Sequence, residues 1–431
     1  MAETKVAMQQ RLKVVAGVSV ERTGPDTPAG KYLRRFWQPV YHSADLKPGR
    51  PVPLRIMSED FTLYRGESGE VHLVAPRCPH RGTRLHTGRV EGDDLRCFYH
   101  GWKFAPDGRC LEQPAEESFF AKNVCIRTWP TREYLGLVFA YLGEGEPPEL
   151  PTYPTFESFR GLVEIDSYLR ECNYFQNVEN SLDMSHVGFV HGDNRAAFDG
   201  IGLGRALEAK ESEWGVTYVF RRPDGRQRVQ QFGMPNVFYM TALPTEAEVE
   251  WQESLFWWVP IDDERHMQFS LHRLPLEGEA AARFKAHRAE RRARIDLAHQ
   301  EVCAAVLAGK LHLQDVDRSR VDLVRLQDDI AQVGQGVFAS EHPEKLGRAD
   351  VGLSAIRRLW RRELTAMIEG QPLKDWKRPP NLVPQAWRLE EQGQAPLATM
   401  HEGARAEIVD VRPFVEVEYQ LRGLHGAARR G

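Results

Sequence analysis

CPHRGTRLHTGRVEGDDLRCFYHGWK, residues 78–103, is the stretch that decides the fold of this 431-residue chain. It holds two short motifs, Cys78-Pro-His80 and Cys97-Phe-Tyr-His100, each of which offers one thiolate and one imidazole. A structural zinc finger usually takes both cysteines from one turn and both histidines from one helix. Two mixed motifs instead suit a pair of irons, with both sulfurs on one iron and both nitrogens on the other. The stretch therefore predicts a [2Fe–2S] cluster with two cysteine and two histidine ligands.

This ligand set is that of the Rieske cluster, whose neutral imidazoles raise the reduction potential above that of a four-cysteine cluster. At these residues the chain closely resembles the Rieske proteins. The respiratory branch of that family joins the two cluster loops by a disulfide, and the corresponding positions here are Thr83 and Tyr99. The resemblance is therefore to the oxygenase and ferredoxin branch. A mononuclear zinc site, or loops that contain Cys and His by coincidence, are the alternatives at this point.

Length and composition are those of an ordinary soluble protein of two or three domains. Lys and Arg total 57 and Asp and Glu total 61, and the formal charge of −4 gives no reason to expect nucleic acid or an anionic membrane as a partner. No run approaches the roughly eighteen apolar residues of a membrane span, and the apolar run 14–20 is expected to be a strand. We expect a cytoplasmic protein in which the cysteines outside the cluster are free thiols: Cys110, Cys125, Cys172 and Cys303.

The segment GEGEPPELPTYP at 143–154 is the clearest domain boundary, because its Pro, Gly and Glu residues cannot continue a strand or a helix. Before it, alternating segments such as 61–66 and 70–76 predict hairpins, and 135–143 predicts a buried strand. We expect residues 1–146 to form an N-terminal segment plus a β-rich cluster domain with its core at about 35–145. Residues 147–431 would form the second domain.

The second domain is expected to be an antiparallel sheet with helices packed on it, so the fold class of the chain is α+β. Period-two patterns and turn residues predict hairpins at 216–232 and 248–274. Helical periodicity predicts helices at 171–192, from Glu277 to about Lys310, at 321–334 and at 353–370.

A second metal motif lies in the first of these helices, where Asp183, His186 and His191 form the pattern D-x-x-H-x4-H. Two histidines with a distant carboxylate match the 2-His-1-carboxylate facial triad, which leaves open positions on Fe(II). On an ideal helix residues i and i+5 lie about 140° apart, so both histidines face one metal only if the helix bulges or ends between them. Gly188 makes a break plausible.

From the segment PAGKYLRRFWQPV to the helices after residue 370, the chain resembles an α subunit of the Rieske non-haem iron ring-hydroxylating oxygenases. It is most similar to the phthalate dioxygenase branch, with NVENSLDMSHVGFVH as the iron-binding helix and WVPIDD at 258–263 as a later strand and turn. The resemblance implies an N-terminal all-β Rieske domain and a C-terminal helix-grip catalytic domain that holds mononuclear Fe(II).

The same resemblance implies roles for two aspartates. The family's third iron ligand is an aspartate on a late helix, and QDDIAQVGQG at 327–336 matches that segment, with Asp328 at the ligand position and Asp329 as the alternative. In the family an aspartate at the position of Asp183 bridges an iron histidine and a cluster histidine of the neighbouring subunit. Here it would link His186 to His100.

The expected function is that of a terminal oxygenase component. O2 is the co-substrate, and a separate flavin and iron–sulfur reductase would supply electrons from NAD(P)H. Electron transfer between subunits implies a homotrimer or a stack of two trimers. The expected reaction is dioxygenation of an aromatic carboxylate to a cis-dihydrodiol. Alternatives are monooxygenation or O-demethylation of an aryl ether and, from other classes, a Rieske electron carrier or a zinc-binding module.

Substrate contacts cannot be assigned from the sequence. A cationic partner for a carboxylate could be any of four arginines in the expected region: Arg195, Arg205, Arg221 and Arg222. Met234-Pro235 and the aromatic run Phe256–Trp258 are candidates for the cavity wall, although aromatic residues in strands are usually part of the core.

Overall fold

The structure is a computed structural model of the chain. It describes residues 14–15, 18–117, 120–192, 205–221, 227–242, 252–295, 297–320, 322–379, 382 and 404–425. The described residues divide into two compact units. One contains Leu33–Pro151 together with the residues from Gln420 onward, and the other contains the residues before Leu33 together with Thr152–Tyr419. The sequence expectation had used a single boundary at residue 146.

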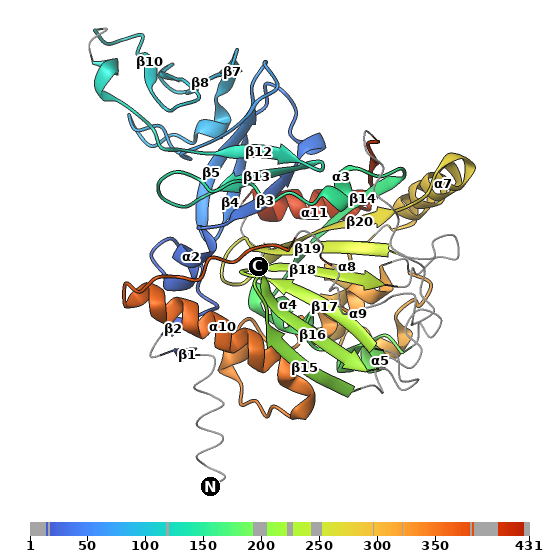
Figure 1. The fold of residues 1–431 in the computed structure, drawn as a ribbon. Helices are drawn as coiled ribbons and strands as arrows, with labels where there is room; N and C mark the ends of the chain where they lie inside the picture. Colours follow the sequence, from blue (N-terminus) through green and yellow to red (C-terminus); the bar gives the residue numbers. More distant parts are fainter. Residues whose placement is uncertain are drawn as a thin grey trace. The chain divides into compact units, whose positions relative to one another are not determined.

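The first unit, which contains the cluster motifs, is built from three antiparallel sheets with strand orders β12-β13-β3, β11-β6-β5-β4 and β10-β9-β8-β7 (Figure 1). The strands are β3 (Trp37–His42), β4 (Val52–Ile56), β5 (Glu59–Arg65), β6 (Val71–Val74), β7 (Arg89–Glu91), β8 (Asp94–Arg96), β9 (Lys103–Phe104), β10 (Cys110–Glu112), β11 (Thr128–Trp129), β12 (Thr131–Tyr134) and β13 (Leu137–Tyr141). The expected hairpin is present as β5 and β6, paired from Arg65↔Val71 to Thr62↔Val74.

The core of this unit lies directly behind the two metal-binding motifs. Leu95 on β8 pairs with Phe104 on β9, and both side chains are fully buried. One cluster motif fills the hairpin loop between these two strands, and the other follows β6. Rigid strands packed on a core thus hold both loops, as ligand-bearing loops require.

The second unit contains an eight-stranded sheet in the order β15-β16-β17-β18-β19-β20-β14-β21. Its strands are β14 (Leu162–Arg170), β15 (Arg205–Glu211), β16 (Gly215–Arg221), β17 (Gln227–Gly233), β18 (Val237–Ala242), β19 (Gln252–Pro260), β20 (His266–Leu274) and β21 (Glu407–Asp410). The pairing is antiparallel as expected, except that β21 runs parallel to β14. Two short strands, β1 (Val14–Val15) and β2 (Val18–Ser19), replace the single strand expected at 14–20.

The described residues also form α-helices. They are α2 (Pro28–Leu33), α3 (Pro154–Glu157), α4 (Tyr174–Asn180), α5 (Ser185–Val190), α7 (Gly278–Arg294), α8 (His299–Leu307), α9 (Leu323–Val333), α10 (Val351–Ile368) and α11 (Phe414–Leu424). Helix α10 lies beside β15 and β16, while α4 contacts β19 and α9, and α5 contacts α9 (Figure 1). Together α4, α5 and α9 therefore form a compact group next to the sheet.

Two of the helices expected from the sequence are divided in the structure. The expected helix 171–192 is α4 and α5, with a turn at residues 181–184 between them. The helical segment from Glu277 is α7 and α8.

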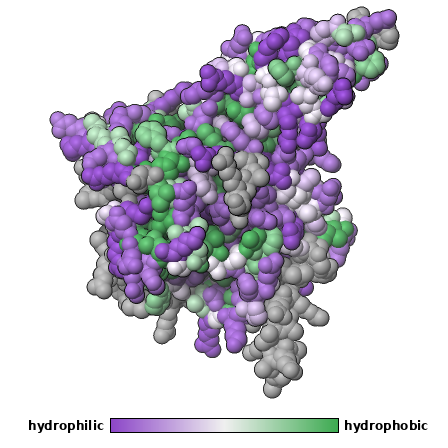
Figure 2. Space-filling view, turned by 180° about the vertical axis from the view of Figure 1, so that it is seen from behind, coloured by the Kyte–Doolittle hydropathy of each residue, from purple (hydrophilic) through white to green (hydrophobic). Residues whose placement is uncertain are grey.

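Surface character agrees with the composition. Figure 2 shows apolar side chains gathered toward the middle of one face and hydrophilic side chains around them. Among the described helices, none combines the length and the apolar character needed to cross a membrane.

Candidate functional site

The turn between α4 and α5 brings Asp183, His186 and His191 into position. Asp183 lies in this turn, and its Oδ1 accepts a hydrogen bond from Ser185 N at 2.8 Å, which helps to start α5. His186 is in the first turn of α5, whereas His191 lies just beyond the last helical residue, with φ −106° and ψ 14°. The helix therefore ends before the second histidine. Gly188, where the sequence placed the break, is inside α5.

The third member of this group comes from α9. His186 Nε2 lies 3.7 Å from Asp328 Oδ1, and His191 Nε2 lies 3.3 Å from the same oxygen. One ligand atom from each of the three residues lies within 4.8 Å of the others. Two imidazoles and one carboxylate thus converge on a space of the size that one metal ion occupies.

The state of these atoms tests whether a metal fits. Asp328 Oδ1 is buried and has no hydrogen-bond partner. A buried carboxylate oxygen without a partner is costly, and a cation between it and the two Nε2 atoms would remove that cost. The donor set is the one that non-haem Fe(II) oxygenases use. The residues therefore fit a mononuclear iron.

Electrostatics favours the ionised carboxylates that a metal requires. Burial alone would raise the pKa of Asp328, but His191 and Arg170 outweigh it and hold that pKa well below its usual range. Burial likewise acts to raise the pKa of Asp183, and the neighbouring His186 reverses the shift. His186 Nδ1 lies 3.6 Å from Asp183 Oδ2, an arrangement that orients the ring so that its Nε2 faces Asp328.

Two residues around the site were missed by sequence reasoning. Gln327 Oε1 lies 3.0 Å from His191 Nδ1, where it can accept the ring proton and fix the tautomer. Its position next to Asp328 was the available signal. Arg170, at the end of β14, lies 3.5 Å from Asp328 Oδ2. No sequence motif around Arg170 indicates this role.

Asp329, the alternative ligand in the sequence, points away from the two histidines. Its side chain is buried, and it lies 3.2 Å from Arg170 Nε and 2.9 Å from His299 Nε2. The other nitrogen of His299 contacts Glu416 on α11. Because His299 faces a carboxylate from each ring nitrogen, its pKa rises to about 9 despite the opposing effect of burial.

A second group of possible metal ligands among the described residues consists of His299, Asp322 and Glu416. Both nitrogens of His299 already face carboxylates, and Arg320 makes two hydrogen bonds to Asp322, each of 2.8 Å. This group is an ion-pair network that joins α8, α9 and α11.

The two cluster motifs have the same backbone design. Cys78 N donates to Thr83 O at 2.9 Å, and Cys97 N donates to Trp102 O at 2.8 Å. In each loop the residue four places after the cysteine is a glycine, Gly82 or Gly101, with φ of 74° or 72°. Only glycine adopts this left-handed conformation without strain, so both loops close tightly around their cysteine.

The side chains of the motifs also converge. Cys78 and Cys97 are each 3% exposed and are free thiols. Burial raises the pKa of Cys78 to about 11, and the nearby Cys97 contributes to the shift. The rings of His80 and His100 have centroids 4.4 Å apart. Two buried thiols beside two imidazoles fit a Rieske cluster, whose irons stabilise the thiolates that burial otherwise opposes.

The predicted substrate contacts lie in different surroundings. Arg195 and Arg222 are outside the described residues, Arg205 begins β15, and Arg221 is exposed at the end of β16. Met234 is buried. Of the aromatic run, Trp257 packs against Tyr153, whereas Phe256 and Trp258 share a face with Phe238.

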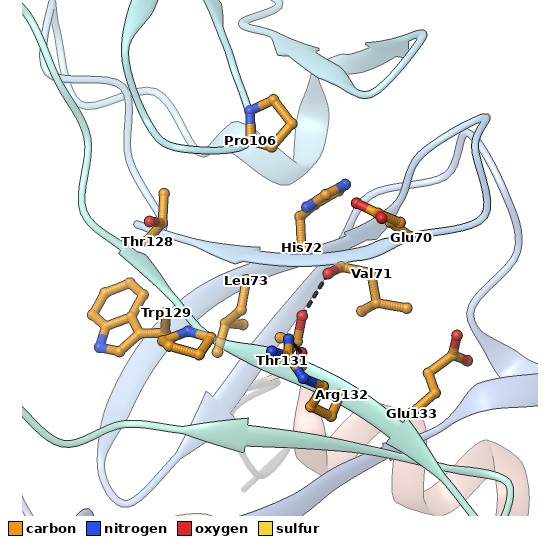
Figure 3. Close-up of a pocket in the computed structure, with 11 residues that line it drawn as sticks. Glu70, Val71, His72, Leu73, Pro106, Thr128, Trp129, Thr131, Arg132 and Glu133 are labelled. Atoms are coloured by element: carbon orange, nitrogen blue, oxygen red, sulfur yellow. Dashed lines mark hydrogen bonds between the residues drawn. The ribbon is translucent and has the colours of Figure 1, made fainter. Parts of the chain in front are cut away.

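A pocket of about 490 Å³ lies elsewhere, in the unit with the cluster motifs (Figure 3). Its lining residues come from β6, β11, β12 and neighbouring loops: Glu70, Val71, His72, Leu73, Pro106, Thr128, Trp129, Pro130, Thr131, Arg132 and Glu133. Thr131 Oγ1 donates to Val71 O across its floor. None of the predicted metal ligands lines this pocket.

Comparison with known proteins identifies relatives of this chain. The Rieske [2Fe-2S] domain family matches residues 36–134. The 5,5'-dehydrodivanillate O-demethylase oxygenase subunit of Sphingobium sp. (strain NBRC 103272 / SYK-6) is 30% identical over 90% of this chain and 86% of its own length. Phenoxybenzoate dioxygenase subunit alpha of Ectopseudomonas oleovorans is 33% identical over 80% of this chain and 83% of its own.

A solved structure shares the fold. The terminal oxygenase of carbazole 1,9a-dioxygenase from Novosphingobium sp. KA1 has a TM-score of 0.56 at 19% identity, covering 87% of this chain and 100% of that one. The expected fold, an all-β Rieske domain followed by a domain of helices and sheet, is confirmed. The chain belongs to the Rieske non-haem iron aromatic ring-hydroxylating oxygenases: it is an oxygenase subunit that uses a [2Fe–2S] cluster, a mononuclear iron, O2 and electrons from a separate partner.

Proposed function

We propose that Cys78, Cys97, His80 and His100 hold the Rieske cluster, and that His186, His191 and Asp328 hold the mononuclear iron. The observation that carries the iron assignment is the convergence of three ligand atoms within 4.8 Å, with Asp328 Oδ1 buried and unpartnered among them. When bound, this iron would supply the site of O2 activation. We further propose that the Rieske domain lies within residues 1–146 and the catalytic domain within 147–431, although the residues before Leu33 belong to the same compact unit as the iron site.

Asp183 is proposed to connect the two metal centres. One of its oxygens faces His186 Nδ1, and the carboxylate remains 29% exposed. A second imidazole could therefore reach it, and we propose that this is His100 of the neighbouring subunit. A carboxylate between two metal-bound imidazoles would orient both rings and offer a short hydrogen-bonded route for the electron. Such a route between subunits implies a closed ring, a homotrimer or a stack of two.

The proposed substrate is an aromatic carboxylate, with dioxygenation to a cis-dihydrodiol as the favoured reaction. Support comes from the substrate named for the related phenoxybenzoate dioxygenase and from the aromatic face formed by Phe238, Phe256 and Trp258. O-demethylation of an aryl ether is the second candidate, because a relative that covers 90% of this chain is named as an O-demethylase.

The partner is proposed to be a flavin and iron–sulfur reductase that takes electrons from NAD(P)H. The compartment is proposed to be the cytoplasm, since the cysteines outside the proposed cluster form no disulfide and a reducing environment preserves free thiols.

Metal analysis combined with O2 consumption tests the function. Anaerobically purified protein is expected to contain about three irons and two acid-labile sulfides per chain. With a reductase, benzoates and their aryl ethers should then be compared for O2 uptake, with cis-dihydrodiol or formaldehyde release distinguishing the two reactions. Two irons that persist after Fe(II) reconstitution would rule out the proposed iron site.

A further inference from the structure

Arg170 is a buried cation immediately behind the proposed iron ligand. It ends β14, and its side chain is 1% exposed. Its guanidinium donates a hydrogen bond to the Tyr168 hydroxyl at 2.7 Å and lies 3.2 Å from Asp329 Oδ1. A guanidinium presents its donors in one rigid plane, so contacts on several sides fix its position.

The two oxygens of Asp328 face different partners. Oδ2 lies 3.5 Å from Arg170, while Oδ1 is the atom nearest to His191 and has no hydrogen-bond partner. Arg170 is thus placed to occupy one oxygen and leave the other for a metal. A carboxylate without this contact could turn to offer both oxygens to the metal and take up a further coordination position.

We propose that Arg170 is a positioning residue for the mononuclear iron: by engaging Asp328 Oδ2, it makes Asp328 a ligand through Oδ1 alone. This inference rests on the iron ligands proposed above. The open position that results is the one that O2 and substrate need at a facial triad.

Buried ion pairs on the side away from Asp328 hold Arg170 in position. Asp329 contacts Arg170 and His299, and Glu416 holds His299 from α11. This row of alternating charges is nearly or fully buried, so the attraction between its members is weakly screened. The arrangement fixes the guanidinium against β14 and resists its movement toward the metal.

The test uses full-length protein with its cluster in place and its mononuclear site emptied by a chelator. Co(II) is the probe, because its ligand-field spectrum reports the number and arrangement of ligands. Arg170→Met is expected to shift the Co(II) spectrum toward a higher coordination number, because Asp328 can then offer both oxygens, and to leave Co(II) affinity no lower than in the wild type. Arg170→Lys should recover part of the wild-type spectrum, because an ammonium keeps the charge but lacks the planar set of donors of a guanidinium.

Arg273→Met is the matched control. Arg273 is also buried in this sheet, on β20, and pairs with Glu253 at 2.7 Å, but it does not contact the iron ligands. It should lower the unfolding temperature while leaving Co(II) affinity and spectrum unchanged. The visible spectrum of the Rieske cluster reports folding of the other unit in every variant.

The outcomes separate this inference from the proposed function. Loss of Co(II) binding in Asp328→Ala with a wild-type Co(II) spectrum in Arg170→Met would overturn the role of Arg170 alone. Retention of binding in Asp328→Ala and His186→Ala would overturn the iron site itself. Equal changes of the Co(II) spectrum in Arg170→Met and Arg273→Met would mean that Arg170 acts only through general stability, which also overturns the inference.

Discussion

Asp183 performs two tasks with two oxygens, since Oδ1 accepts the Ser185 N–H and Oδ2 faces His186. Asp183→Asn keeps the size of the side chain and one acceptor oxygen but removes the charge that holds the imidazole. We expect both metal sites to remain loaded while product formation falls about 10- to 100-fold. Single-turnover measurement of cluster oxidation after addition of substrate and O2 would locate the loss in electron transfer.

The exposed Asp317→Asn provides the comparison, because Asp317 bonds only locally, to Ser319. It should leave the rate of cluster oxidation unchanged. If Asp183→Asn behaves in the same way, the proposed route through Asp183 is wrong.

Individual residues differ in how far the sequence could identify them. The cluster motifs and the D-x-x-H-x4-H pattern could be found because metal ligation demands particular residue types at close spacing. Arg170 could not, because its role comes from the tertiary contact of β14 with α9, whereas the only sequence signal for Gln327 was its place next to Asp328. The sequence could not tell which of Asp328 and Asp329 is the ligand. The orientation of α9 decides this, because it turns Asp328 toward His186 and Asp329 toward His299.

Among the secondary-structure elements, α5 affects the site most, because its ends set the relative positions of His186 and His191. The sequence predicted a helix here but not where it ends. A continuous helix from residue 171 to 192 would have separated His186 and His191 by about 140°. The structure instead ends α5 at Val190 and turns the chain before Asp183. Tertiary packing decides such boundaries, because the turn must fit between α10 and the sheet.

Gly352 makes that fit possible. A Cβ at this position of α10 would lie 2.3 Å from the carbonyl oxygen of Leu182, the residue before Asp183. We expect Gly352→Ala to destabilise the protein by about 1–3 kcal/mol, because this clash exceeds the gain in helix propensity. It should also weaken metal binding by displacing Asp183. Thermal unfolding and Co(II) titration would measure the two effects.

Gly347→Ala is the control for this prediction, since the nearest atom to its Cβ would be Asp350 Oδ2 at 3.6 Å. It should change the unfolding temperature little. An unfolding temperature of Gly352→Ala no lower than that of Gly347→Ala would show that the turn is not tightly fixed.

The network that joins α8, α9 and α11 predicts a dependence of stability on pH. His299 faces Glu416 and Asp329, and the ring of Tyr168 lies 5.4 Å away. Since its folded pKa rises from 6.5 to about 9, the stability from its charge is fully present below pH 6.5 and is lost as pH rises through about 9. The pKa of Glu416 falls to about 2, so its contribution is lost only in strong acid.

Unfolding temperatures measured from about pH 6 to about pH 10 test this linkage. The wild type should lose stability across that range, and His299→Gln should start lower and change less. The exposed His312→Gln should follow the wild type. Parallel curves for all three proteins would assign the pH dependence to other groups.

At the scale of the whole molecule, the proposed route from His100 through Asp183 of another subunit makes the assembly, and not the single chain, the unit of catalysis. Cys97→Ser would remove the cluster but leave the iron site, and His186→Ala would do the reverse. Each variant alone should be inactive. Because transfer across an interface needs one metal from each side, co-assembly of the two variants in equal amounts should restore about a quarter of wild-type activity, and about a third in mixed trimers selected from that preparation.

That restoration distinguishes transfer between subunits from transfer within one chain, since no single chain in the mixed assembly has both metal centres. Separately tagged variants, purified by both tags after co-expression, would ensure that only mixed assemblies are assayed. Simple mixing of the purified variants controls for exchange between assemblies. If the co-assembled protein is active, the intact cluster of one subunit must reduce the iron of its neighbour. If well-folded mixed assemblies are completely inactive, electron transfer takes place within a single chain.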